Sequence, residues 1–140
     1  MADVAISSVT GAELDQAQVL RLYASVGWTA YTATPEVLFA GLAGSTHIVA
    51  ARLGPDLIGL ARIVSDGATV AYLQDVLVHP DHQRRGLGRR LIDAVLEPVA
   101  HVRQKVLLTD DEPAVRDFYA RLGWTDGADR SLRAFVRLDG

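Results

Sequence analysis

The sequence predicts a single domain of the α/β (α+β) class over residues 1–140, with a mostly antiparallel sheet flanked by helices. Three observations predict it: apolar runs joined by short turns, apolar residues at helical spacing on either side of them, and one strand–helix–strand crossover. With 49% hydrophobic and 22% charged residues, the 140-residue chain can bury a sizeable core. We expect about six to seven strands and about four helices.

The first third of the chain reads as one strand followed by two helices. Residues 4–9 alternate weakly between apolar and polar side chains and end at a Thr-Gly pair, which is typical of a strand. An apolar stripe with spacing i, i+3, i+4, i+7 then predicts an amphipathic helix, formed by Val19, Leu22, Tyr23 and Val26. Thr34 and Pro35 suit the N-cap and the first position of a second, shorter helix that ends at about residues 41–44.

Three strands and short turns occupy the middle of the chain. Residues 47–53, 57–64 and 69–78 are rich in apolar and β-branched side chains. Gly-Pro-Asp and Ser-Asp-Gly separate them, and turns this short indicate an antiparallel meander.

The last third begins with a helix and a buried strand. Leu87, Leu91, Ala94 and Val95 form an apolar face, and residues 105–109 then predict a strand parallel to the one before the helix. Pro113 opens a further helix, whose C′ residue we expect to be Gly123. The alternating residues 131–138 predict a last strand, at an edge that can pair across a homodimer.

Composition excludes several kinds of function. The chain has no cysteine, which excludes disulfides and thiolate chemistry, and its histidines show no metal-ligand arrangement, so we expect no metal. A net charge of −3 argues against nucleic acid or an anionic membrane as partner. The N-terminus lacks the pattern of a signal peptide and residues 37–51 are too short to span a bilayer, so we expect a soluble, cytoplasmic protein.

The residues that concentrate chemistry lie between the fourth predicted strand and the helix after it. This turn consists of Gln83, Arg84, Arg85, Gly86, Leu87 and Gly88, with Arg89 and Arg90 beside it. A helix N-terminus offers unpaired N–H groups and partial positive charge, and glycine lets a phosphate approach the backbone. The turn therefore suits a small phosphate-bearing ligand, although a tight turn also needs glycine for its dihedral angles. It lacks the third glycine of the dinucleotide fingerprint and the Gly-Lys-Ser/Thr of a P-loop.

Two segments in this order carry a resemblance to a known family. L-V-H-P and Q-R-R-G-L-G before a helix, followed by D-F-Y-A-R-L-G-W, resemble the GNAT superfamily of acyl-CoA-dependent N-acetyltransferases. The V-G-W, D-V-L-V and F-Y-x-x-L-G-W elements are more narrowly similar to plant serotonin N-acetyltransferase-like proteins. The resemblance implies direct transfer of an acetyl group from acetyl-CoA to the amine of a small molecule or a peptide. The alternative that we keep is a non-catalytic acyl-CoA-binding or regulatory module.

The resemblance also implies roles for individual residues. The positions that match the family's cofactor site are Val76, Leu77 and Val78 for the pantetheine arm, Gln83 to Arg89 for the pyrophosphate, and Phe118 in the F-Y pair. Tyr119 matches the tyrosine that protonates the departing CoA thiolate, although its place on an apolar stripe also fits core packing. Glu112 departs from the asparagine found in many members.

The acceptor side rests on fewer residues. Asp75, a carboxylate in an otherwise apolar strand, is either the base that deprotonates the amine or a structural aspartate. Tyr72 and Gln74 stand where other members carry an ionisable group, and neither is a good base, so a chain of water molecules is a further route. Trp28 and Tyr31 lie in the segment that covers the acceptor pocket in similar families, where they either bind the amine or anchor their own loop.

Overall fold

The computed structural model describes residues 3–139 and divides the chain into two compact units. The first unit ends at Leu108 and holds the sheet with four of the helices; the second begins at Thr109 and holds the last helix. Each unit is described by itself below. The single domain expected over residues 1–140 stays a prediction.

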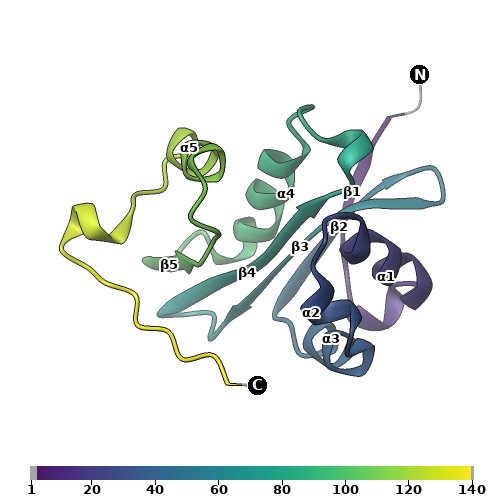
Figure 1. Ribbon diagram of the computed structural model, residues 1–140, viewed down its shortest axis with the longest axis horizontal. Helices are drawn as coiled ribbons and strands as arrows, with labels where there is room; N and C mark the ends of the chain where they lie inside the picture. Colours follow the sequence, from purple (N-terminus) through teal and green to yellow (C-terminus); the bar gives the residue numbers. More distant parts are fainter. Residues whose placement is uncertain (1–2, 140) are drawn as a thin grey trace. The chain divides into compact units, whose positions relative to one another are not determined.

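The first unit is built on a five-stranded sheet with the order β1-β2-β3-β4-β5 (Figure 1). Neighbouring strands from β1 to β4 are antiparallel, whereas β4 and β5 are parallel. The strands are β1 (Ala5–Val9), β2 (His47–Leu53), β3 (Asp56–Ser65), β4 (Val70–Val78) and β5 (Gln104–Leu107). The meander and the crossover that the sequence predicts are therefore confirmed.

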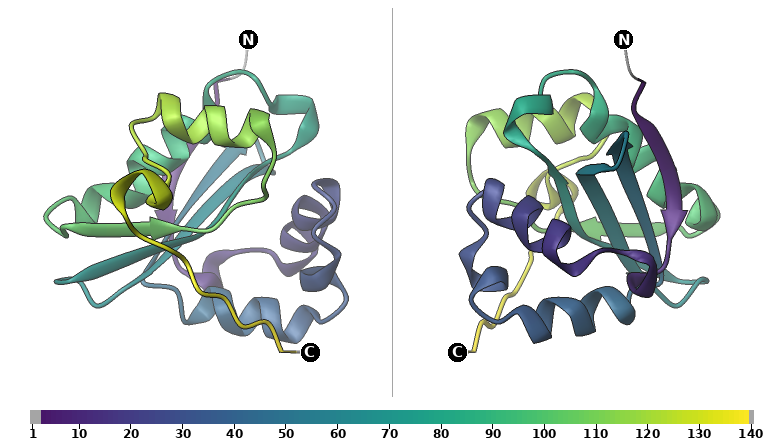
Figure 2. Two further views of the ribbon diagram at one scale, coloured as in Figure 1. Left: turned by 60° about the vertical axis from the view of Figure 1, so that its left-hand side comes forward. Right: turned by 90° about the vertical axis from the view of Figure 1, so that its right-hand side faces the viewer.

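Helices cover both faces of this sheet, as the two views of Figure 2 show. On one face lie α1 (Gln16–Ser25), α2 (Thr29–Thr32) and α3 (Pro35–Ala43), and on the other lies α4 (Leu87–Leu96). Asp15 caps α1 by accepting a hydrogen bond from the Ala17 N–H at 2.9 Å. Pro35 occupies the first turn of α3 after Thr34, as expected.

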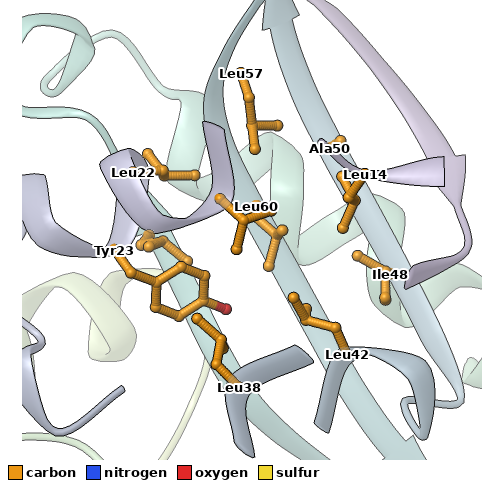
Figure 3. Close-up of a cluster of buried hydrophobic side chains, with 11 residues drawn as sticks. Leu14, Leu22, Tyr23, Leu38, Leu42, Ile48, Ala50, Leu57 and Leu60 are labelled. Atoms are coloured by element: carbon orange, nitrogen blue, oxygen red, sulfur yellow. The ribbon is translucent and has the colours of Figure 1, made fainter. Parts of the chain in front are cut away.

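A core of buried hydrophobic side chains lies between the sheet and the helices α1 and α3 (Figure 3). Leu22 and Tyr23 of α1 and Leu38 of α3 point toward Leu60 of β3, and all four are at most 1% exposed. On the opposite face, a Cβ atom added to Gly59 of β3 would lie 3.0 Å from a methyl group of Leu91 on α4. The helices on both faces therefore pack directly onto the central strands of the sheet. This packing holds β4 in place between the two helical layers.

The second unit contains α5 (Pro113–Arg121) and a short 3₁₀ turn, Gly127–Arg130. The helix ends as expected, because Gly123 has a left-handed φ of 91° and its N–H bonds the Ala120 carbonyl oxygen at 3.1 Å.

Two expectations about the elements are wrong. Residues 131–138 form no strand, so the described part of the chain has a five-stranded sheet in place of six to seven strands. Apolar and polar side chains do alternate along this segment, but a strand also needs a neighbouring strand to bond its backbone groups. These residues are exposed instead, and the exposed fraction of Phe135 is 94%. The other difference is α2, a four-residue helix that brings the α-helices of residues 3–139 to five.

No helix within residues 3–139 is long and apolar enough to cross a bilayer.

Candidate active site

A β-bulge marks the middle of β4. Asp75 pairs with Arg62 of β3, but the next pair along the ladder joins Leu73 to Ile63, so Gln74 is an extra residue on β4. Such a bulge brings two successive side chains to one side of a strand and bends the strand. Bulges are frequent beside active sites, and this one lies within the stretch that the sequence singles out.

Beyond the bulge, β4 directs some of its peptide groups away from β3. The His79 N–H donates to the Ile58 carbonyl oxygen at 2.8 Å, which fixes the phase of the antiparallel ladder. Because bonded and non-bonded pairs alternate, the N–H and C=O groups of Val76 and Val78 face away from β3.

On that side β4 has no neighbouring strand. The register of β5 on β4 stops at the pair Leu73–Leu107, within the described residues, so β4 extends past its partner by a free edge. The Leu77 peptide groups instead face β3, and its side chain belongs to the core. Of the three residues predicted to meet the pantetheine arm, Val76 therefore presents both its N–H and its C=O group to the open edge. Val78 presents its N–H group, because its carbonyl oxygen accepts a hydrogen bond from the Gln83 side chain at 2.9 Å.

The turn that follows β4 has the backbone that its glycines suggest. Gly86 is the N-cap of α4 with φ 78°, and Arg84 also has a positive φ, 65°, which non-glycine residues seldom adopt. Residues of left-handed conformation in such a short turn make successive N–H groups converge on one point, as in anion-binding loops.

The N-terminus of α4 has no side-chain cap. The Arg90 N–H is bonded to the Gly86 carbonyl oxygen, which leaves the amides of Leu87, Gly88 and Arg89 without an intrahelical acceptor. The Gln83 side chain donates through Nε2 to the Val78 carbonyl oxygen at 2.9 Å, so the turn is tied to the end of the free edge. The edge and the helix N-terminus therefore belong to one continuous surface.

The arginines of this turn differ in their surroundings. Arg84 and Arg85 are exposed, and Arg89 lies 3.9 Å from Asp93 one helical turn away. Arg90 reaches the Val4 carbonyl oxygen at 3.5 Å. Arg84 and Arg85 are thus the guanidinium groups of the turn that are available to an anion.

The predicted base, Asp75, lies in a buried polar network. Its carboxylate is 3% exposed and accepts hydrogen bonds from Arg62 Nε at 2.6 Å and from the hydroxyls of Tyr23 and Tyr31, each at 3.0 Å. Arg62 also donates to the Gly41 carbonyl oxygen and the Ser45 hydroxyl, both at 3.3 Å. These contacts are those expected of the structural aspartate that was the second interpretation of Asp75.

The network is charge-balanced, and the pKa values of Tyr23 and Tyr72 are raised. Burial opposes the charge on Arg62, but the Asp75 carboxylate outweighs it, and the pKa of Arg62 is raised. Burial and then the charge of Asp75 raise the pKa of Tyr23 well above its ordinary range. The pKa of Tyr72 is raised by burial and next by Tyr31 and Asp75, so Tyr72 is no better a base than expected.

Trp28 and Tyr31 form one aromatic cluster with Tyr23. The ring centroid of Tyr23 lies 5.8 Å from that of Trp28 and 5.2 Å from that of Tyr31, and both pairs of rings are arranged edge to face. Trp28 and Tyr31 are half-buried and pack on the core. The cluster anchors the α1–α2 segment while part of each of these two rings stays accessible.

The second unit places Phe118 and Tyr119 in an aromatic group of its own. Their ring centroids are 5.0 Å apart, and Trp124 lies 6.2 Å from Tyr119. Burial raises the pKa of the Tyr119 hydroxyl, which therefore keeps its proton at neutral pH. Both interpretations of Tyr119, packing and proton donation, agree with these contacts.

The sequence reasoning missed the partners of Asp75. Arg62 is the one charged residue in L-I-G-L-A-R-I-V, just as Asp75 is in Y-L-Q-D-V-L-V. Opposite charges in two adjacent apolar strands predict a buried ion pair, and that signal could have found Arg62. Nothing in the sequence pairs Tyr23 with a strand 52 residues away.

Residues 3–139 contain no group of three or more His, Asp or Glu side chains that could hold a metal ion.

The chain belongs to the Acetyltransferase (GNAT) family, which residues 13–124 match. Over 73 residues it is 40% identical to an uncharacterised ycf52-like N-acetyltransferase of Prochlorococcus marinus. The matched segment covers 51% of this chain and 39% of that protein. Over 70 residues it is 39% identical to the chloroplastic GCN5-related N-acetyltransferase 2 of Arabidopsis thaliana, covering 49% of this chain and 26% of that one. The chain thus matches less than half the length of these relatives.

A solved structure agrees over nearly the whole chain. The GNAT family acetyltransferase of Streptococcus pneumoniae TIGR4 has a TM-score of 0.86 with 28% identity, and the match covers 98% of each chain. The family resemblance is therefore confirmed, and the relatives that match include chloroplastic and ycf52-like proteins, not specifically serotonin N-acetyltransferase.

Proposed function

We propose that this protein transfers an acetyl group from acetyl-CoA to a primary amine by direct attack of the amine on the thioester. The observation that carries the proposal is the free edge of β4 joined to the uncapped N-terminus of α4. Acetyl-CoA is a peptide-like arm attached to a pyrophosphate, and these two surfaces offer one site for each part.

Backbone groups bind the arm and the pyrophosphate in this proposal. The arm pairs with the N–H and C=O groups of Val76 and with the N–H of Val78 as an added strand would, because amides in the arm need the hydrogen-bond partners that the edge offers. The pyrophosphate takes the N–H groups of Leu87, Gly88 and Arg89, with Arg84 and Arg85 as counter-charges.

The chemistry requires a neutral amine, an oxyanion site and a proton for the leaving thiolate. An alkylammonium has a pKa of roughly 10 and must lose its proton before its nitrogen attacks the carbonyl carbon. The Val76 N–H stabilises the oxyanion, and collapse of the intermediate breaks the C–S bond. Tyr119 protonates the thiolate, a role that rests on the family's F-Y motif and on the raised pKa that keeps its hydroxyl protonated.

The role of Asp75 as the proton acceptor stays a prediction, and its surroundings oppose it. Arg62 Nε lies 2.6 Å from Asp75 Oδ2 and forms a buried ion pair with it, so the carboxylate is already engaged. Three donors already occupy Asp75. We therefore favour proton loss through water to solvent, with Asp75 as a structural residue.

The experiment that tests the function is a thermal-shift titration with CoA and acetyl-CoA, followed by an amine panel read by thiol release. A ligand at about 100 times its Kd stabilises the folded state by about 2.7 kcal/mol, so binding would raise Tm. No shift with either compound would refute the proposal. Binding without transfer to any amine would support the non-catalytic module.

Replacing Tyr119 with phenylalanine is expected to reduce kcat by about a hundredfold, in the range typical of a general acid, with little change in KM for acetyl-CoA. The variant keeps the ring that packs on Phe118 and Trp124. Steady-state kinetics measure the effect. An unchanged kcat would assign Tyr119 to packing alone.

We also propose that Trp28 and Tyr31 line the acceptor pocket and favour an amine with an aromatic or apolar body. Their half-buried rings beside a charge-balanced network support this, since the network offers a cationic amine no net negative charge. Trp28→Ala is expected to raise KM for the amine by about tenfold while KM for acetyl-CoA stays constant. Equal changes in the two KM values would contradict the assignment.

A further inference from the structure

We infer that Tyr31 is a positioning residue that holds the β-bulge of β4, and through it the backbone edge that receives the cofactor arm. The inference rests on the proposed function. It gives the buried network around Asp75 a role that the transfer reaction itself does not require.

The bulge presents two neighbouring side chains to one phenol. In a regular strand Gln74 and Asp75 would point to opposite faces, but the extra residue lets both turn toward α2. The Tyr31 hydroxyl donates to Asp75 Oδ1 at 3.0 Å and accepts from Gln74 Nε2 at 2.9 Å. One oxygen atom therefore bridges the two residues that form the bulge.

The anchor of this bridge is rigid. Asp75 Oδ2 is held from the other side by Arg62 Nε at 2.6 Å and by the Tyr23 hydroxyl at 3.0 Å. Arg62 Nη2 also lies 3.3 Å from the Tyr31 oxygen. The Gln74 side chain is exposed, and Tyr31 is its one hydrogen-bond partner among the described residues. Tyr31 is thus the link between a fixed buried pair and an otherwise free side chain.

The position of the bulge explains why this link bears on the cofactor. Gln74 directly follows Leu73, the last residue of β4 that pairs with β5, and Val76 begins the free edge two residues later. A slip of one residue would turn the peptide groups of Val76 and Val78 from the open edge toward β3. Fixing the bulge therefore fixes which peptide groups the edge presents.

The test compares two tyrosines that each donate one hydrogen bond to Asp75. Tyr31→Phe removes the contact with Gln74, whereas Tyr23→Phe removes only a bond to Asp75. Isothermal titration with CoA gives two quantities. The stoichiometry reports the fraction of protein that is folded, and the Kd reports whether the site keeps its geometry. We expect Tyr31→Phe to raise the Kd for CoA by about three- to tenfold, as for loss of one hydrogen bond. Tyr23→Phe is expected to lower Tm and leave the Kd unchanged.

A double-variant cycle that combines Tyr31→Phe with Gln74→Ala distinguishes two cases. Either Tyr31 acts on the cofactor edge through Gln74, or Tyr31 contacts the cofactor directly. If Tyr31 acts through Gln74, then Gln74→Ala raises the Kd for CoA as Tyr31→Phe does, and the double variant is no weaker than either. An unchanged Kd in Tyr31→Phe, an equal change in Tyr23→Phe, or an additive cycle would overturn the inference. Wild-type protein that fails to bind CoA would refute the proposed function instead, so the two failures are distinguishable.

Discussion

Replacing Arg62 with methionine is expected to lower the free energy of unfolding by about 3–5 kcal/mol, the typical cost of removing one partner of a buried ion pair. Asp75 would be left 3% exposed, with two tyrosine hydroxyls and no opposite charge. Urea unfolding followed by circular dichroism measures the loss, which should appear as a lower midpoint at unchanged slope.

Two further variants control this result. Arg62→Met combined with Asp75→Leu should recover much of the loss, because no unpaired charge then stays buried. Arg103→Met, at an exposed position, should change stability by less than about 0.5 kcal/mol. A loss below about 1 kcal/mol in Arg62→Met would mean that Asp75 takes up a proton or reaches solvent, contrary to the packing described above.

Replacing Gly86 with valine is expected to reduce the affinity for CoA by at least about a hundredfold, which corresponds to about 2.7 kcal/mol. Gly86 has φ 78°, where an L side chain costs about 1–2 kcal/mol, and it is the N-cap residue directly before the N–H groups that we assign to the pyrophosphate. Calorimetric titration with CoA measures the change.

Gly67 provides a matched control for this substitution. It has φ 77°, and, as at Gly86, a Cβ atom added there has no heavy atom within 4 Å in the described structure. Because Gly67 lies in the β3–β4 turn, Gly67→Val carries the same backbone strain away from the N-terminus of α4. It should lower stability and leave the Kd for CoA unchanged. Equal losses of affinity in both variants would show that strain, and not the phosphate site, causes the effect.

The sequence by itself predicted most of the elements and their order. Apolar stripes of helical period predict α1 and α5, and the turns around residues 54–56 and 65–67 predict the meander, because these signals depend only on neighbours along the chain. The same local logic located the turn at residues 83–88, where glycine and arginine stand at the start of a helix. The family resemblance, which two short motifs carry, was confirmed by the match of residues 13–124 to the family.

The tertiary structure decided what depends on pairing across the fold. Residues 131–138 have the alternation of a strand and no partner, because a ladder is made by two segments and a pattern describes only one. Only the strand register shows that Gln74 is an extra residue, that β5 stops at Leu107 and that the peptide groups of Val76 face an open edge.

Asp75 illustrates the difference most directly. As a charged residue in an otherwise apolar strand, Asp75 could equally be a base or a structural aspartate, because the sequence does not show which groups its carboxylate contacts. The choice rests on Arg62, 13 residues away in the chain and 2.6 Å away in space, and on two tyrosines from α1 and α2. Those distances are set by how the helical layer packs on the sheet, which no local pattern in the sequence encodes.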